Sequence, residues 1–317
     1  MQNFISDSVL FTSTKDEFLT RLVSPGKLKY RRYTASPLRY AGGKSLAVGF
    51  IIEHLPADLS RIVSPFLGGG SVEIACANEL GLEVVGYDIF DVLCTYWQVQ
   101  LNQPNDLAKR LRQFEPSRTT FAAVKERLNQ HWTHGKKLAK LDLASHYYFN
   151  SNTSYGPHFL GWPSDVYLNR LRYEKMVDKV EAFSAKTLSV NCASFENSIP
   201  QHGGDFLYCD PPYYLEDGKM FTGMYPHRNF PVHHVGFKHA VLRDLLLEHA
   251  RNGGGFILSY NDCPIIREWY SGFEFDTPKW QYTFGQGDVR IGENRRDLNG
   301  GSHIKRSHEL LIWHHPD

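Results

Sequence analysis

The segment that most constrains the fold begins with Arg61–Leu67 (RIVSPFL), a short β-type run that ends in three glycines. Ser71–Leu80 follows with helical spacing, and Ser71 is the expected N-cap. Glu83–Tyr87 (EVVGY) then has the pattern of a second strand, with Asp88 at its end. A strand, a glycine loop, a helix and a strand in this order form a βαβ unit, which predicts a parallel sheet and an α/β fold.

Further elements extend this sheet from the second half of the chain. Strands are expected at Leu188–Ala193, Asp205–Cys209, Gly255–Tyr260 and Glu309–Trp313. Val241–Ala250 has the spacing of an amphipathic helix, and the glycines that follow it are typical of a helix C-terminus. The sheet is therefore predicted to combine both ends of the sequence.

The alternation of strands and helices stops in the middle of the chain, where the composition becomes helical and basic. Helices are expected at Leu107–Phe114, Phe121–His131 and Leu138–Phe149, and a polar and aromatic loop at Asn150–Pro163. Residues 101–187 hold 14 Lys and Arg against 8 Asp and Glu. This pattern predicts an inserted, mainly helical domain at 101–187 between the two parts of another domain, 1–100 and 188–317. Its basic side chains fit either a nucleic-acid surface or a solvated helical face.

Composition excludes several classes of protein. The formal net charge is +1, which by itself indicates no partner. The five cysteines are far apart and form no CxxC pair, and no histidines have metal-ligand spacing, so neither a disulfide framework nor a metal site is expected. The longest apolar run, Leu46–Ile52, is much shorter than a membrane span. These features favour a cytoplasmic enzyme with no metal and no membrane segment.

The first candidate for a ligand site is the glycine-rich segment Ser64–Ser71 (SPFLGGGS). Glycines at a strand end let the backbone approach a ligand, and the helix that follows offers free N–H groups. Asp88 follows Gly68 by 20 residues, the spacing that places a carboxylate beside the ribose of a nucleotide-like ligand. The segment is not a G-x-G-x-x-G fingerprint, because Glu73 stands at the last position, and a structural glycine turn remains the alternative.

The second candidate is Tyr40–Ser45 (YAGGKS). It resembles the end of a triphosphate-binding P-loop, but that motif requires a glycine where Leu38 stands, and no buried strand precedes it. We therefore reject a nucleoside triphosphate site. What remains is a glycine turn that presents Lys44 and the ring of Tyr40.

The strongest chemical signal is Asp210-Pro211-Pro212-Tyr213, directly after an apolar strand. Proline restricts the residue before it, so Asp210 and Pro211 are expected to be extended, and prolines offer carbonyl acceptors without N–H donors. A carboxylate, a carbonyl and an aromatic ring then meet at one rigid strand end. This arrangement suits a planar exocyclic amine, whose two N–H donors reach two acceptors while its ring stacks on Tyr213. A structural Pro-Pro turn is the alternative.

Taken together and in order, these motifs resemble the Dam-like N6-adenine DNA methyltransferases, the D12 class. PLRYAGGKS is similar to the family's N-terminal S-adenosyl-L-methionine motif, PFLGGGS to its glycine loop and YCDPPYY to its catalytic motif. The segment IREWY and the ending HELLIW are also similar to stretches of that family. The resemblance implies the α-group order on a Rossmann-like S-adenosyl-L-methionine-dependent sheet. Residues 1–100 and 188–317 would then form the cofactor-binding catalytic domain, and 101–187 the target recognition domain.

The resemblance also implies roles for individual residues. The catalytic residues would be Asp210, Pro211, Pro212 and Tyr213. The residues that bind S-adenosyl-L-methionine would be Tyr40, Ala41, Gly42, Gly43, Lys44, Pro65, Phe66, Gly68, Gly70, Asp88, Ser194, Phe195 and Asp210. Ser194 and Phe195, placed in the strand before the DPPY motif, would flank the adenine of the cofactor.

DNA contacts are expected from the basic insertion and from a late basic loop. The candidates are Lys136, Lys137, Asn152, Tyr155, Arg170, Arg172, Arg290, Arg295 and Arg296. The late loop at 285–308 fits an ordinary surface hairpin equally well. Met220–Pro231, after the DPPY motif, is a candidate lid over the target base.

The sequence thus predicts a site-specific methyltransferase that acts on N6 of adenine in double-stranded DNA, with the base flipped out of the duplex. It would work in the cytoplasm, on nucleoid DNA, as part of a restriction–modification pair or as an orphan epigenetic regulator, and as a monomer or a homodimer. RNA and N4 of cytosine are the nearest alternative substrates. A hydride-transfer enzyme would need a glycine fingerprint that is missing, and a non-enzymatic DNA-binding protein would have damaged motifs.

Overall fold

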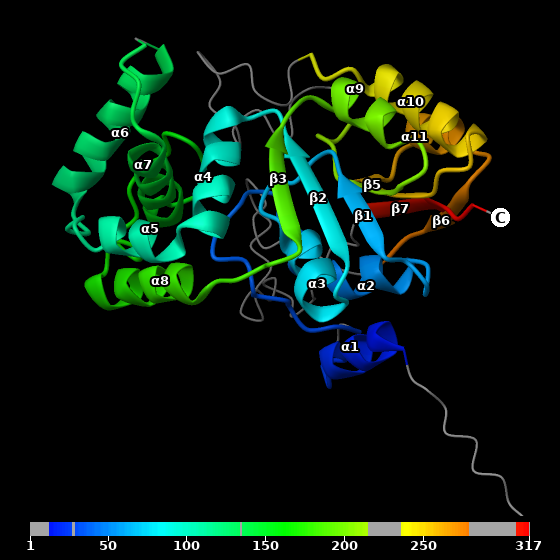
Figure 1. Ribbon diagram of the computed structural model, residues 1–317, viewed down its shortest axis with the longest axis horizontal. Coiled ribbons are helices and arrows are strands. Elements are labelled where there is room, and N and C mark those ends of the chain that lie inside the picture. Colours follow the sequence, from blue (N-terminus) through cyan, green and yellow to red (C-terminus); the bar gives the residue numbers. More distant parts are fainter. Residues whose placement is uncertain (1–12, 27–28, 134, 215–235, 279–308, 317) are drawn as a thin grey trace, which may run out of the picture.

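The computed structural model describes residues 13–26, 29–133, 135–214, 236–278 and 309–316. Within them lies a seven-stranded sheet in the order β3-β2-β1-β4-β5-β7-β6 (Figure 1). The strands are β1 Arg61–Ser64, β2 Glu83–Asp88, β3 Leu188–Cys192, β4 Phe206–Cys209, β5 Phe256–Asn261, β6 Glu274–Asp276 and β7 Glu309–His314. The strands from β3 to β5 run parallel, and β7 pairs antiparallel with both β5 and β6. The predicted α/β fold is confirmed.

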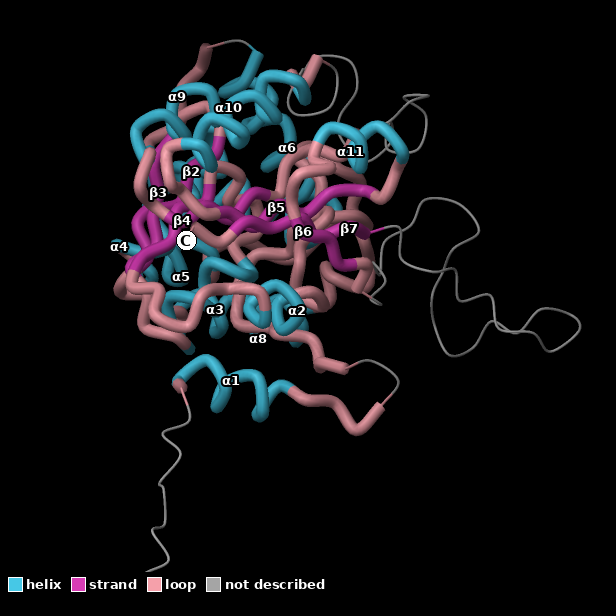
Figure 2. Tube along the Cα trace, turned by 90° about the vertical axis from the view of Figure 1, so that its right-hand side faces the viewer, coloured by secondary structure: helices cyan, strands magenta, loops and turns pink. Residues whose placement is uncertain are grey.

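Helices cover both faces of this sheet (Figure 2). One face carries α2 Val48–Glu53 and α3 Ser71–Glu79, with α1 Thr14–Leu22 beyond them. The other face carries α9 Phe195–Ser198, the 3₁₀ turn Ile199–His202, α10 His239–Arg251 and α11 Pro264–Trp269. Ile62 and Val63, adjacent in β1, belong to two different hydrophobic clusters because successive strand side chains point to opposite faces. A sheet buried on both faces explains why these strands are apolar runs without polar alternation.

The middle of the chain, from α4 through the basic region, is a group of helices beside the β3 edge of the sheet (Figure 1). The helices are α4 Asp91–Asn102, α5 Pro104–Leu111, α6 Arg118–Thr133, α7 Lys140–Thr153 and α8 Arg170–Ala182. Tyr148 of α7 and Val177 of α8 belong to the same hydrophobic cluster as Ile51 and Val84 at the sheet. The helices therefore share a core with the sheet, and a separate domain at 101–187 stays a prediction.

Three local predictions are wrong. The N-cap of α3 is Gly70, with a φ of 66°, and Ser71 is already helical. The predicted loop from Asn150 begins later, because α7 continues through Thr153. Ser194 and Phe195 do not lie in a strand, since β3 ends at Cys192 and Ser194 caps α9. The first two placements came from local sequence signals and the third from the family resemblance, and the left-handed Gly70 explains the first difference.

No helix among the described residues is both long and apolar enough to cross a lipid bilayer.

Candidate active site

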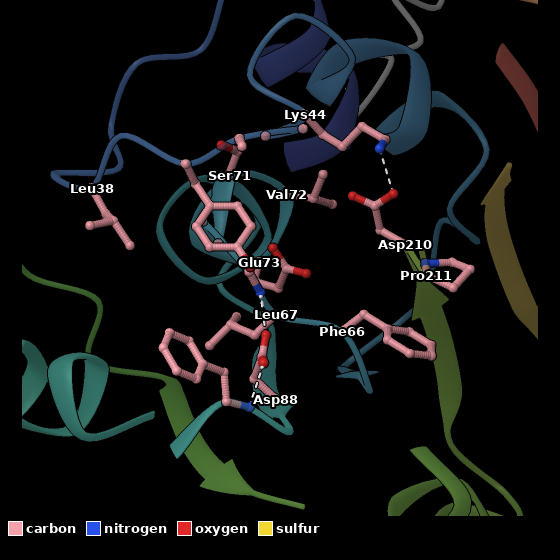
Figure 3. A pocket seen from close by; sticks show the side chains of 18 of the residues that line it. Leu38, Lys44, Phe66, Leu67, Ser71, Val72, Glu73, Asp88, Asp210 and Pro211 are labelled. Carbon is pink, nitrogen blue, oxygen red and sulfur yellow. Dashed lines mark hydrogen bonds and ion pairs between the residues drawn. The ribbon is translucent and has the colours of Figure 1, made fainter. Parts of the chain in front are cut away.

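The predicted motifs meet at one edge of the sheet. Strands β2, β1 and β4 are neighbours and run parallel, so their carboxyl ends point to the same side. The glycine turn follows β1, Asp88 ends β2, and the Asp210 corner follows β4. All three line a single cavity of about 900 Å³ (Figure 3). Ligands of open parallel sheets bind at this edge, where the order of the strands reverses.

The glycine turn after β1 takes its shape from left-handed residues. Gly68 has a φ of 49° and Gly70 a φ of 66°, values that side chains other than glycine rarely adopt. A Cβ on Gly68 would lie 2.9 Å from the Tyr40 ring. The Trp97 indole N–H donates to the Gly68 carbonyl over 2.9 Å. Tyr40 and Trp97 therefore hold the turn so that its backbone borders the cavity.

Asp88 is buried, and its carboxylate is held by backbone donors. One oxygen accepts the Gly68 N–H over 3.0 Å, and the other accepts the Phe90 N–H over 3.0 Å. These bonds tie the end of β2 to the glycine turn. Ile89, the next residue, is 59% exposed and also lines the cavity. An apolar surface therefore lies beside the carboxylate.

The Tyr40–Ser45 segment lines the same cavity. Its turn is closed by the Gly43 N–H, which donates to the Tyr40 carbonyl over 3.3 Å, and Gly42 has a φ of 74°. Ala41, Gly42 and Gly43 all border the cavity. Lys44 is only 5% exposed, and its ammonium donates to Asp210. The turn thus delivers a cation into the interior of the site.

The corner after β4 carries the second acid of the site. The Asp210 side chain is 20% exposed. Burial raises the pKa of its carboxyl above the ordinary value, and the charge and hydrogen bond of Lys44 oppose that rise. Pro211 and Pro212 follow and line the cavity without contributing N–H donors. The Tyr213 hydroxyl donates to Glu309 on β7, which fixes the ring beside Lys44.

An aromatic wall closes one side of the cavity. Phe66 lies 5.5 Å from Phe195 and 5.9 Å from Phe237, measured between ring centroids, and the last two lie 5.1 Å apart. Ser194 and Pro65 border the cavity beside these rings. Phe66 and Phe195 were predicted from the sequence. Phe237 was missed because it lies just before α10, where the sequence carries no motif.

Glu73 is a second residue that sequence reasoning missed. It lies in the first turn of α3, is 3% exposed and borders the cavity. Burial raises its pKa to about 7, although its hydrogen bond from the Ser64 hydroxyl, 2.6 Å long, lowers it. The available signal was an acid within an otherwise apolar helix. In the sequence, this residue served merely to exclude a G-x-G-x-x-G fingerprint.

The predicted DNA contacts fall into three groups. The residues on the surface are Lys136, Lys137, Tyr155, Arg170 and Arg172. The prediction that Asn152 contacts DNA is wrong. Asn152 is fully buried, and its side chain accepts the Arg39 backbone N–H over 3.0 Å. Its carbonyl accepts the Arg39 guanidinium over 2.7 Å, so Asn152 ties α7 to the segment before Tyr40 and cannot face DNA. Arg290, Arg295, Arg296 and the candidate lid Met220–Pro231 lie outside the described residues.

No group of three His, Cys, Asp or Glu side chains in the described part of the chain is arranged to hold a metal ion.

Comparisons with known proteins match most of this chain. The family model described as D12 class N6 adenine-specific DNA methyltransferase matches residues 40–284. "Type II methyltransferase M.FokI" of Planomicrobium okeanokoites is 27% identical over 68% of this chain and 35% of its own length. "Retron Ec67 DNA adenine methylase" of Escherichia coli is 25% identical over 81% of this chain and 87% of its own length. "DNA N-6-adenine-methyltransferase" of Escherichia phage P1 is 27% identical over 77% of this chain and 32% of its own length. The chain therefore spans about a third of the M.FokI and phage P1 proteins.

Proposed function

Because the chain belongs to the D12 class of N6 adenine-specific DNA methyltransferases, we propose that it transfers a methyl group from S-adenosyl-L-methionine to N6 of adenine in double-stranded DNA. One observation carries this proposal. The Asp210 corner, which can grip an amino group, opens onto the same cavity as the glycine turn and Asp88, which can hold a nucleoside. Transfer between two substrates requires such a shared space.

The residues present fit S-adenosyl-L-methionine. The cavity volume of about 900 Å³ suits a ligand of this size. An ionised carboxylate offers about four lone-pair sites, so Asp88 can accept ribose hydroxyls in addition to its two backbone donors. The exposed side chain of Ile89 and the ring of Phe195 offer apolar surface for the adenine. The rest of S-adenosyl-L-methionine would be enclosed by Tyr40–Lys44, Pro65, Phe66, Gly68 and Gly70. Glycine is needed at position 68, because a side chain there would collide with Tyr40.

In the transfer, the corner after β4 would hold and orient the amino group. When bound, S-adenosyl-L-methionine supplies a methyl group on a cationic sulfur. The Asp210 carboxylate and the Pro211 carbonyl would accept the two N–H donors of the base, which aims the nitrogen lone pair at that methyl group. Orientation of two bound reactants can lower a barrier by about 7–11 kcal/mol. Asp210 acts as an acceptor, and the proton of the product amine leaves to water.

The target adenine would reach this corner by flipping out of the duplex. Asp210 is largely buried, so a base that remains stacked cannot contact its carboxylate. Extruding one base costs a few kcal/mol, and stacking on an aromatic side chain recovers part of that cost. Tyr213 is the ring adjacent to the acceptors, and its bond to Glu309 holds it in place. The exposed residues Lys136, Lys137, Tyr155, Arg170 and Arg172 are the proposed contacts to the DNA.

The test combines labelled S-adenosyl-L-methionine with nucleoside analysis. Unmethylated genomic DNA and an RNA sample of equal mass are incubated with the full chain, digested to nucleosides and separated. We expect label in N6-methyladenine from the DNA alone. Label in N4-methylcytosine, or label in the RNA alone, would contradict the assignment. Sequencing of the methylated adenines then identifies the recognition sequence.

A further inference from the structure

A third carboxylate, that of Glu73, lines the cavity together with Asp88 and Asp210. Glu73 is 3% exposed, and it accepts a hydrogen bond from the neutral hydroxyl of Ser64, 2.6 Å away. Glutamate is almost never fully buried unless it is paired, because a desolvated charge is costly. A serine hydroxyl does not balance a charge. The ionised form of Glu73 therefore requires a further electrostatic partner.

The polar groups that face Glu73 come from each element packed around it. They are Cys76 on α3 itself, Ser64 on β1, Tyr208 on β4, Asp210 after β4 and Lys44 before α2. Lys44 is the cation of this set, and it faces two carboxylates. Figure 3 shows the ion pair of Lys44 and Asp210, with Glu73 lining the same cavity from a third segment, α3. The charge of one ammonium therefore acts on two acids, and its ion pair is with Asp210.

Within this set, Glu73 can change its charge near neutral pH, and the Lys44 ammonium favours its ionised form. Burial raises its pKa to about 7, the Ser64 hydrogen bond lowers it, the Asp210 charge raises it and the Lys44 charge lowers it. Burial and the neighbouring acids also raise the pKa values of Cys76 and Tyr208, whose ordinary values already lie above neutral pH. Cys76 and Tyr208 therefore remain neutral where Glu73 changes charge.

The positive charge of Lys44 weakens Asp210 as an acceptor for the target base, although the carboxylate has lone pairs for both donors. Lys44 donates to the same Asp210 carboxylate that must accept a hydrogen bond from the target base. We propose that Glu73 is a positioning residue for methyl transfer: its carboxylate takes up the Lys44 ammonium when the amino group of the base engages Asp210. An ammonium carries three donors on a flexible stem, so this exchange breaks no covalent bond. The inference rests on the proposed function.

The test measures single-turnover transfer against pH for the wild type and for Glu73→Gln. The amide keeps the size of the side chain and can still accept from Ser64, but it cannot carry charge. We expect the wild-type rate to rise with pH through about 7, because ionised Glu73 is the form that holds Lys44. Glu73→Gln should lack that rise and be slower by roughly 10²-fold at pH 8, the size of effect that misplaced groups produce. Its dissociation constant for S-adenosyl-L-methionine should stay within about threefold of the wild type.

Two further variants keep the test specific. Glu79→Gln makes the same change at the far end of α3, where Glu79 pairs with Arg21 over 3.0 Å, and should leave the pH profile as it is. Ser64→Ala removes the hydrogen bond that stabilises ionised Glu73. The pKa of Glu73 should then rise, so the increase in rate should move to higher pH. A packing role for Glu73 would not move the profile in this direction.

The outcomes separate this inference from the proposed function. If the wild type transfers no methyl group to DNA adenine, the proposed function fails. If the wild type is active and Glu73→Gln retains both the rate and its rise near pH 7, the positioning role is wrong. Loss of S-adenosyl-L-methionine binding in folded Glu73→Gln would also contradict it, because Glu73 would then be a cofactor ligand.

Discussion

Asp88 and Asp210 follow parallel strands of one sheet and line one cavity, but they are held in different ways. Asp88 accepts two backbone N–H groups, each over 3.0 Å, from residues that flank it in the fold. Asp210 is held by the ammonium of Lys44, from a different segment. Backbone donors cannot leave without unfolding the turn, whereas a lysine can exchange acceptors. The same topology thus provides a fixed anchor at one strand end and an exchangeable acceptor at the other.

This difference suits two separate tasks. A ligand that must stay bound through the reaction needs an acceptor whose geometry the backbone sets. A base whose amino group becomes methylated and then leaves needs an acceptor that can gain and lose partners. Burial raises the pKa of Asp210 and Lys44 opposes this, so the charge of Asp210 depends on a side chain. Variants at the two acids should therefore fail in different ways.

The largest effect is expected from Asp210→Ala. This variant should lower single-turnover methyl transfer by at least about 10³-fold, since it removes the acceptor that aims the amino group. Binding of DNA should change little, because Asp210 acts on the amino group and not on phosphates. Rapid-quench assays measure the first effect, and equilibrium titrations measure the second. Activity within tenfold of the wild type would remove Asp210 from the reaction.

The motifs on either side of this comparison could be predicted because their signals are local. A proline constrains its own neighbour, and a glycine at a strand end marks a turn, so Asp210 and Gly68 are visible without tertiary structure. The parallel pairing of β1 and β2 follows from the βαβ pattern. That Asp210 lies at the same edge as Asp88 was implied by the family resemblance, and the pairing of β4 with β1 is seen in the structure. The α/β fold and the three motifs were accordingly predictable.

What could not be predicted depends on packing between distant segments. Glu73 looks like a polar residue of an ordinary helix until α3 is buried against the sheet. Asn152 looks like a loop residue that could read DNA, but α7 buries it against Arg39, 113 positions away in the sequence. Phe237 joins the cavity through the tertiary position of the residues just before α10. No local propensity encodes such contacts.

The second prediction tests the anchor. In Asp88→Asn, the side-chain amide can accept from one of the two backbone donors and turns its own N–H group toward the other. Hydrogen bonds to charged groups contribute about 1.5–3 kcal/mol, so affinity for S-adenosyl-L-methionine should fall roughly 10–100-fold. The rate at saturating S-adenosyl-L-methionine should change much less, which calorimetry and saturation kinetics would show. A rate lost at unchanged affinity would mean that the two acids do not differ as proposed.

The third prediction concerns the turn that Asp88 supports. Gly68→Ala forces a side chain into a φ of 49° and places its Cβ 2.9 Å from the Tyr40 ring. Gly81 is the matched control, since it has a φ of 70° and a Cβ added there would meet no atom within 4 Å. Both variants should lose about 1–2 kcal/mol of unfolding free energy from backbone strain. Gly68→Ala alone should also weaken S-adenosyl-L-methionine binding several-fold, as measured by denaturation and titration. Equal affinity in the two variants would show that Tyr40 does not couple the turn to the ligand.

The smallest effect is expected outside the cavity, where exposed lysines should influence DNA binding without altering Asp88 or Asp210. Lys136→Ala with Lys137→Ala removes two exposed cations of the helical region. Each phosphate contact contributes about 0.9 to the slope of log affinity against log salt, so the slope should flatten by up to about 1.8. Lys186→Ala is the control, because this exposed lysine precedes β3, at the amino ends of the parallel strands and away from the cavity. Fluorescence anisotropy with a duplex across a salt series gives the slopes.

A slope that falls equally in the control would assign the effect to net charge, and an unchanged slope would remove this surface from the DNA interface. In either case single-turnover rates at saturating DNA should match the wild type, because the anchor and the acceptor both lie inside the cavity.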